Sequence, residues 1–99
     1  MIQLIRDLQQ NDFKTMYKQQ GISYLGLFGS FARGEATPQS DIDLLIDFDE
    51  TISLFDLAHV KLYFQDTLGK KVDLAMRGSL KKSLEPYIMK DLITVYEKN

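Results

Sequence analysis

The 99-residue sequence contains no cysteine, no tryptophan, a single histidine and only two prolines. The absence of cysteine excludes a disulfide framework, a thiol nucleophile and any zinc site built on thiolates. The single histidine, His59, excludes a metal site made of clustered histidines, and we interpret it as a packing or surface residue. Any metal ion is therefore expected to be held by carboxylates, which favours a hard cation such as Mg²⁺.

The chain also lacks a strong excess of either charge and has no long apolar run. Twelve basic and 14 acidic side chains give a formal net charge of −2, so no direct nucleic-acid substrate is expected. Neither a secretory signal nor a membrane span is visible, which predicts a cytoplasmic protein without membrane association. The hydrophobic fraction of 44% and the charged fraction of 26% are typical of one globular domain, expected over residues 1–99.

Apolar periodicity predicts an α/β fold with a small mixed sheet of about three strands packed with helices. The expected strands are residues 23–28, 41–48 and 71–76. An N-terminal helical stretch is expected to break near Asp12, which is expected to cap a second helix. A further helix is expected to begin after Ser53 as its N-cap and to stop at Gly69, and Ser83 is expected to cap the last helix. The segment Ile93-Thr94-Val95 is open to two readings, as a continuation of that helix or as an edge strand.

Strand 41–48 carries the first part of a candidate site. Its even positions are all apolar, whereas Asp41 and Asp43 lie two residues apart and so project from the same face. The two like charges repel unless a divalent cation lies between them. Asp73, in the middle of the next expected strand, is placed to reach the same metal or the space beside it. Three such carboxylates suit two tasks, which are holding Mg²⁺ and accepting a proton from an attacking hydroxyl.

The turn at Gly29-Ser30 supplies the complementary part of the site. A strand that ends in a Gly-Ser turn before a helix presents backbone N–H groups and a hydroxyl to an anion. Gly29 also removes the Cβ that would keep a phosphate away. Arg33 is placed either to contact a phosphate or to lock the loop onto the carboxylate strand. Together with the carboxylates, these residues predict a site for a nucleoside triphosphate bridged to Mg²⁺.

Alone, a Gly-Ser turn or an Asp-x-Asp pair is usually only a turn or a solvated strand end, but here ten residues separate Ser30 from Asp41 and the next strand carries Asp73. This pattern resembles the signature of the polymerase-β-like nucleotidyltransferases, and more closely that of the minimal nucleotidyltransferase (MNT) family. The resemblance implies a nucleotidyltransferase fold over nearly the whole chain. It also implies that Gly29 and Ser30 bind the triphosphate, that Asp41 and Asp43 ligate Mg²⁺, and that Asp73 is the third catalytic carboxylate, which completes the set of catalytic and metal-binding residues Asp41, Asp43 and Asp73.

Members of this minimal family are typically antitoxins of HEPN-domain ribonuclease toxins. The resemblance therefore implies a Mg²⁺-dependent transfer of AMP from ATP to a hydroxyl, expected to be a tyrosine, of a HEPN partner within a hetero-oligomer. Two alternatives stay open: an antitoxin that acts by binding alone, and a transferase for a small molecule with aminoglycoside-like hydroxyls. The basic cluster formed by Arg77, Lys81 and Lys82 is interpreted as a solvated face, or as a surface toward phosphates or the toxin.

Overall fold

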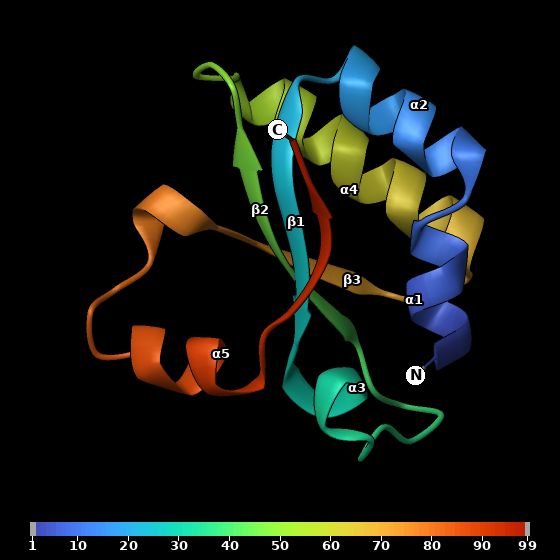
Figure 1. The fold of residues 1–99 in the computed structure, drawn as a ribbon, viewed down its shortest axis with the longest axis vertical. Helices are drawn as coiled ribbons and strands as arrows, with labels where there is room; N and C mark the ends of the chain where they lie inside the picture. Colours follow the sequence, from blue (N-terminus) through green and yellow to red (C-terminus); the bar gives the residue numbers. More distant parts are fainter. Residues whose placement is uncertain (1, 99) are drawn as a thin grey trace.

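A four-stranded sheet organises the chain in the computed structural model, which describes residues 2–98 (Figure 1). The strands follow the order β3-β2-β1-β4, with bounds β1 (Ile22–Phe28), β2 (Ile42–Phe48), β3 (Val72–Met76) and β4 (Ile93–Glu97). Strand β1 is antiparallel to β2 and β4, whereas β2 is parallel to β3. The predicted mixed sheet is confirmed with one strand more than expected, because the segment that begins at Ile93 is an edge strand.

The helices lie on both sides of the sheet. Their bounds are α1 (Ile2–Leu8), α2 (Asn11–Gln19), α3 (Gly29–Arg33), α4 (Leu54–Leu68) and α5 (Glu85–Asp91), with a 3₁₀ turn η1 (Arg77–Ser79). Figure 1 shows α1, α2 and α4 on one side, and η1 and α5 on the other. Helix α4 joins the parallel strands β2 and β3, as a parallel pair requires. Within residues 2–98, no helix combines the length and apolarity needed to cross a membrane.

The core lies between the sheet and α1, α2 and α4. The alternation of β2 places Ile42, Leu44 and Ile46 there, and all three are almost completely buried. The Tyr17 hydroxyl, buried in the same core, donates a 2.7 Å hydrogen bond to the Leu8 carbonyl, and burial raises the pKa of Tyr17. Leu45 is buried as well but lies outside this cluster, on the opposite face with the aspartates. That opposite face is therefore free to carry a site.

Two of the predicted helix boundaries are confirmed and two are wrong. Ser53 caps α4 by accepting a hydrogen bond from the Asp56 N–H at 3.1 Å, and Gly69 ends this helix at φ +68°. Asp12 does not cap α2, because Lys14 N donates to the carbonyl of Gln10, which is the N-cap. Ser83 does not cap α5 either. There a backbone turn starts the helix, since Leu84 N and Glu85 N both donate to the Lys81 carbonyl.

Candidate active site

The parallel pairing of β2 and β3 brings the aspartates of the candidate site together. Asp43 pairs with Asp73 in the register of the two strands, so their side chains project from the same face about 5 Å apart at the backbone. The Ile42 N–H donates to the Lys71 carbonyl at 2.9 Å and fixes this register at the start of both strands. Asp41 immediately precedes β2. The structure thus brings Asp43 and Asp73 side by side, and the catalytic and metal-binding roles of the three aspartates stay predictions.

The electrostatics of Asp43 show that the three carboxylates act on one another. Asp43 is partly buried, and this burial raises its pKa; the negative charges of Asp73 and Asp41 raise it further, while Arg33 opposes the rise. A carboxylate that is partly removed from water beside two like charges is stabilised by a cation. The environment of Asp43 thus favours a bound cation over an empty cluster of charges.

The donor set fits Mg²⁺ but does not form a complete cage. Between residues 2 and 98, no three His, Cys, Asp or Glu side chains converge closely enough to enclose an ion by themselves. Mg²⁺ usually keeps several waters and is bound by one or two carboxylates together with substrate phosphates. A partial set of carboxylates on an exposed strand face is suited to that arrangement, so the assignment of Mg²⁺ to Asp41, Asp43 and Asp73 stays a prediction.

Gly29 brings the loop at the end of β1 into contact with Asp43. It follows Phe28, the residue that pairs with Asp43 across the sheet, and it adopts φ +77°, a conformation that favours glycine. A Cβ at this position would overlap a carboxylate oxygen of Asp43 and lie 3.0 Å from its Cγ. Only glycine therefore allows this approach, and Ser30 follows directly in the first turn of α3.

Arg33 joins two helices and not the loop to the carboxylate strand. Its Nε donates to Glu35 Oε1 at 2.7 Å and its guanidinium also donates to Asp91 Oδ2 at 2.9 Å, which ties α3 to α5. The alternative in which Arg33 locks the loop onto the strand is therefore wrong, and a phosphate contact stays a prediction. Sequence reasoning missed Asp91, because nothing in a pattern indicates a pairing over 58 positions.

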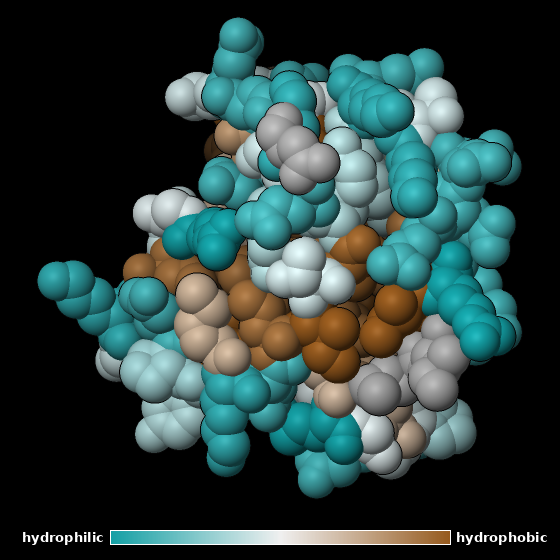
Figure 2. Space-filling model, in the orientation of Figure 1, coloured by the Kyte–Doolittle hydropathy of each residue, from teal (hydrophilic) through white to brown (hydrophobic). Residues whose placement is uncertain are grey.

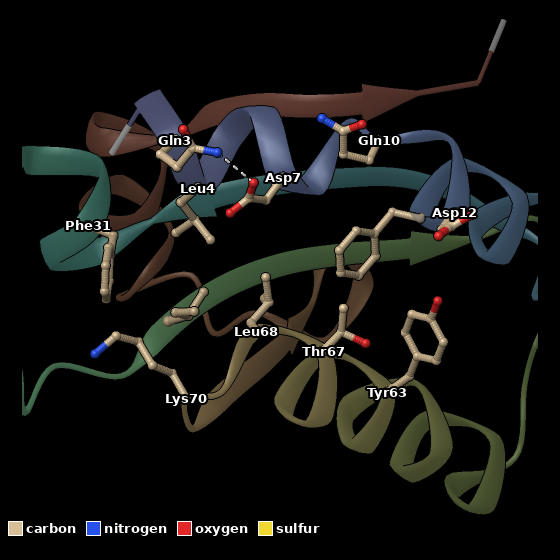
Figure 3. A pocket seen from close by; sticks show the side chains of 12 residues that line it. Gln3, Leu4, Asp7, Gln10, Asp12, Phe31, Tyr63, Thr67, Leu68 and Lys70 are labelled. Carbon is tan, nitrogen blue, oxygen red and sulfur yellow. Dashed lines mark hydrogen bonds between the residues drawn. The ribbon is translucent and has the colours of Figure 1, made fainter.

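A cavity of about 530 Å³ lies on the other face of the sheet, between α1, α2 and α4 (Figure 3). Phe31 and Ile42 line it, so it lies behind the loop and the strand that carry Ser30 and Asp43. None of the three aspartates lines this cavity, and Figure 3 shows its wall formed by helix side chains such as Leu4 and Leu68. The candidate active site is thus a feature of the open sheet face.

The remaining residues of interest lie away from the carboxylates. His59 is exposed on α4, as interpreted, and Asp47 accepts a hydrogen bond from its neighbour Phe48 N at 3.0 Å. The basic cluster lies on η1 and the loop after it, where the Arg77 guanidinium stacks 4.2 Å from the centre of the Tyr24 ring. The candidate active site therefore consists of the Gly29 loop and the three aspartates, which together suit a metal-bound phosphate.

Comparison with known families matches nearly the whole chain. The family model described as "Nucleotidyltransferase domain" matches residues 8–95. The protein adenylyltransferase MntA of Thermococcus cleftensis is 37% identical over 82 residues, which cover 83% of this chain and 83% of that relative. The matched span contains every residue of the candidate site.

Solved structures agree with this match. One named as a minimal nucleotidyltransferase superposes with a TM-score of 0.76 at 32% identity and covers 92% of both chains. A chain in the complex of a tri-AMPylated Shewanella oneidensis HEPN toxin with an MNT antitoxin superposes with a TM-score of 0.68 at 17% identity. This second alignment covers 93% of the present chain and 72% of the other, and it concerns the fold alone. The predicted fold class is confirmed.

Proposed function

Since this chain belongs to the nucleotidyltransferase domain family, and within it to the minimal nucleotidyltransferases, we propose that it transfers AMP from ATP to a tyrosine of a HEPN ribonuclease toxin and thereby acts as an antitoxin. The observation that carries the proposal is the pairing of Asp43 with Asp73 directly beside the Gly29 loop. The name of the Thermococcus relative, a protein adenylyltransferase, supports AMP as the transferred group, and the complex with an AMPylated HEPN toxin supports a HEPN protein as the acceptor. The cytoplasm supplies ATP and Mg²⁺, and we place the protein there.

Each part of the site has a role in binding the nucleotide. The Ser30 hydroxyl and the backbone around Gly29 bind the β- and γ-phosphates, and a phosphate that reaches Arg33 competes with Glu35 and Asp91 for its guanidinium. Asp41 and Asp43, with Asp73 on the neighbouring strand, would hold Mg²⁺, which would neutralise phosphate charge and polarise the α-phosphate. The partly buried Asp43 lies against Gly29, so the carboxylates and the phosphate loop form one continuous site.

The transfer step needs one base and one acceptor. The acceptor oxygen forms a bond to the α-phosphorus while the bond from this phosphorus to the bridging oxygen breaks, and pyrophosphate leaves with the electron pair. The proton of the attacking hydroxyl passes to the carboxylate of Asp73. Asp73 is exposed on the strand next to Asp43, so a hydroxyl from another molecule can reach it. A phenol suits this step because it loses its proton more easily than an aliphatic alcohol.

Replacement of Asp73 by asparagine is expected to separate chemistry from binding. The amide keeps the size of the side chain but cannot accept the proton, so kcat should fall about 100-fold or more. The affinity for ATP with Mg²⁺ should change little, because Asp41, Asp43 and the Gly29 loop remain. Transfer kinetics and a nucleotide titration measure the two quantities, and a loss of affinity as large as the loss of kcat would make Asp73 chiefly a metal ligand.

Nucleotide binding is expected to depend on the cation. ATP alone brings four negative charges to three carboxylates and should raise the melting temperature only slightly, whereas ATP with Mg²⁺ should raise it by several degrees. Thermal unfolding with ATP, with Mg²⁺ and with both measures this difference. Equal stabilisation by ATP with and without Mg²⁺ would show that nucleotide binding does not depend on the metal.

The proposed function is tested by following the two ends of ATP separately. Purified protein is incubated with Mg²⁺, a HEPN-domain toxin, and ATP labelled at either the α- or the γ-phosphate. Label from the α-phosphate alone should become covalently attached to the HEPN protein. Silencing of the toxin without any label would show an antitoxin that acts by binding alone, and label on a small hydroxylated compound would show a small-molecule transferase.

A further inference from the structure

Residues 77–91 form an arm that leaves the sheet after β3 and returns to it at β4. This η1–α5 arm contains η1, the loop that follows it and α5, and it extends beside the sheet on the side opposite α1, α2 and α4 (Figure 1). Two contacts hold its far end. Asp91 accepts the 2.9 Å hydrogen bond from Arg33, and Leu92 packs so closely on Gly26 that a Cβ there would lie 2.6 Å from Leu92 Cδ1. At its near end the Arg77 guanidinium stacks on the Tyr24 ring of β1, and most of the residues between the two ends are exposed.

The arm exposes large apolar side chains. Helix α5 contains no buried residue, and the exposed fractions of Leu84, Tyr87 and Met89 are 50%, 73% and 40%. The space-filling view shows hydrophobic surface across the middle of the molecule, reaching the side on which η1 and α5 lie, with hydrophilic side chains around it (Figure 2). Contiguous apolar surface rimmed by polar residues is characteristic of a site that contacts another protein.

The same arm concentrates positive charge in a chain whose formal net charge is −2. It carries four basic side chains, Arg77, Lys81, Lys82 and Lys90, against Glu85 and the already paired Asp91. None of these four cations forms an ion pair with another residue between 2 and 98. The surface of the arm is thus both positively charged and apolar, whereas the carboxylate site beside it is negatively charged.

Both ends of the arm are connected to the candidate active site. Strand β3 runs from the position of Asp73 directly into η1, so Arg77 lies four residues beyond Asp73, about 13 Å along an extended strand. At the other end, the ion pair of Asp91 with Arg33 joins α5 to the helix that begins with Gly29 and Ser30. A polypeptide lying on the arm is therefore close enough to present a side chain to Asp73.

We propose that the η1–α5 arm is the docking surface for an acidic segment of the protein acceptor, the segment that carries the modified tyrosine. This inference rests on the proposed function, because it concerns how the acceptor reaches the same site. Acidic side chains of the segment pair with the four cations, and its apolar side chains cover Leu84, Tyr87 and Met89. A nucleic acid fits less well, since its phosphates meet the carboxylates of Asp43 and Asp73 and leave the aliphatic side chains uncovered.

The test uses the full chain and three fluorescent probes of equal length. The first is a peptide with one tyrosine, leucines and glutamates; in the second, lysines replace the glutamates; the third is oligouridylate. The test variant combines Lys81→Glu with Lys82→Glu. The control variant combines Lys14→Glu with Lys18→Glu on α2, two exposed lysines on the other side of the sheet. Thermal unfolding of both variants verifies that each is folded.

The acidic peptide is expected to bind at least about tenfold more tightly than the basic one, and the test variant, but not the control, should lose this preference. Equal binding of the two peptides, equal loss in both variants, or tighter binding of oligouridylate would overturn the proposal. Transfer of AMP to a HEPN protein is measured with the same variants. Charge-dependent peptide binding with no transfer to the HEPN protein by any variant contradicts the proposed function alone, whereas equal transfer by the wild type and the test variant contradicts the docking surface alone.

Discussion

Alanine at Asp41 or at Asp43 is expected to reduce AMP transfer by at least about a thousandfold, because a metal ion at the reacting phosphate stabilises the transition state by several kcal/mol. Each substitution removes one predicted ligand oxygen from a set of carboxylates that, within residues 2–98, does not enclose an ion by itself. Steady-state transfer to the HEPN partner measures the effect. No other single side chain of the site, apart from the base Asp73, should matter as much.

The same variants are expected to be at least as stable as the wild type. Burial and the charges of Asp73 and Asp41 raise the pKa of Asp43, so the ionised form is disfavoured in the folded protein. A raised pKa means that the native state binds the proton more tightly, and stability falls as pH rises through this range. The melting temperature of Asp43→Ala without metal should therefore equal or exceed that of the wild type at neutral pH. The difference should disappear below the ordinary pKa of aspartate.

Asp47→Ala is the matched control for these substitutions. Asp47 lies on the same strand and the same face as Asp43, four residues farther along. Its carboxylate accepts a hydrogen bond from Phe48 N and does not face Asp73. It should keep its transfer activity. Full activity in Asp41→Ala and Asp43→Ala, or equal losses in all three variants, would show that the site is assigned to the wrong residues.

Gly29→Ala should lower both activity and stability. At φ +77° the new Cβ strains the backbone by about 1–2 kcal/mol, and it overlaps the carboxylate of Asp43. Either the loop or Asp43 must move, and a displacement of about 1 Å in such a site reduces the rate by roughly 100-fold. Transfer kinetics and thermal unfolding of this variant measure the two losses.

Gly34→Ala separates backbone strain from displacement of the site. Gly34 has nearly the same backbone angle, φ +73°, but a Cβ there meets no atom within 4 Å. This control should lose a similar amount of stability and keep most of the activity. If both glycine variants retain activity, the close approach of Gly29 to Asp43 is not needed for transfer.

The parts of the site that sequence reasoning could predict are those that depend on local pattern. Alternation along residues 41–48 indicates which face carries Asp43, and the strand at residues 72–76 follows from its apolar neighbours. The sequence also shows that Gly29 is followed by a hydroxyl residue at the end of a strand. These features survive folding because a strand keeps its period of two wherever it pairs.

The parts that could not be predicted depend on contacts between distant residues. Strand direction and register decide that Asp43 pairs with Asp73, and no periodicity encodes either. The ion pair of Arg33 with Asp91 depends on how α5 packs against α3. Strand β4 has a short β-branched stretch directly after a helix, and its pairing with β1 decides its conformation. The exposed apolar side chains of α5 look like a core stripe until the fold shows that nothing covers them.

The most direct test of the account is the intact mass of the HEPN partner, with the modified residue located by fragmentation, measured beside its ribonuclease activity. With wild-type protein, ATP and Mg²⁺, the partner should gain AMP on a tyrosine and lose ribonuclease activity, and with Asp43→Ala both changes should be absent. A partner that keeps its original mass while its ribonuclease activity is suppressed, with wild-type protein and Asp43→Ala alike, would contradict the account.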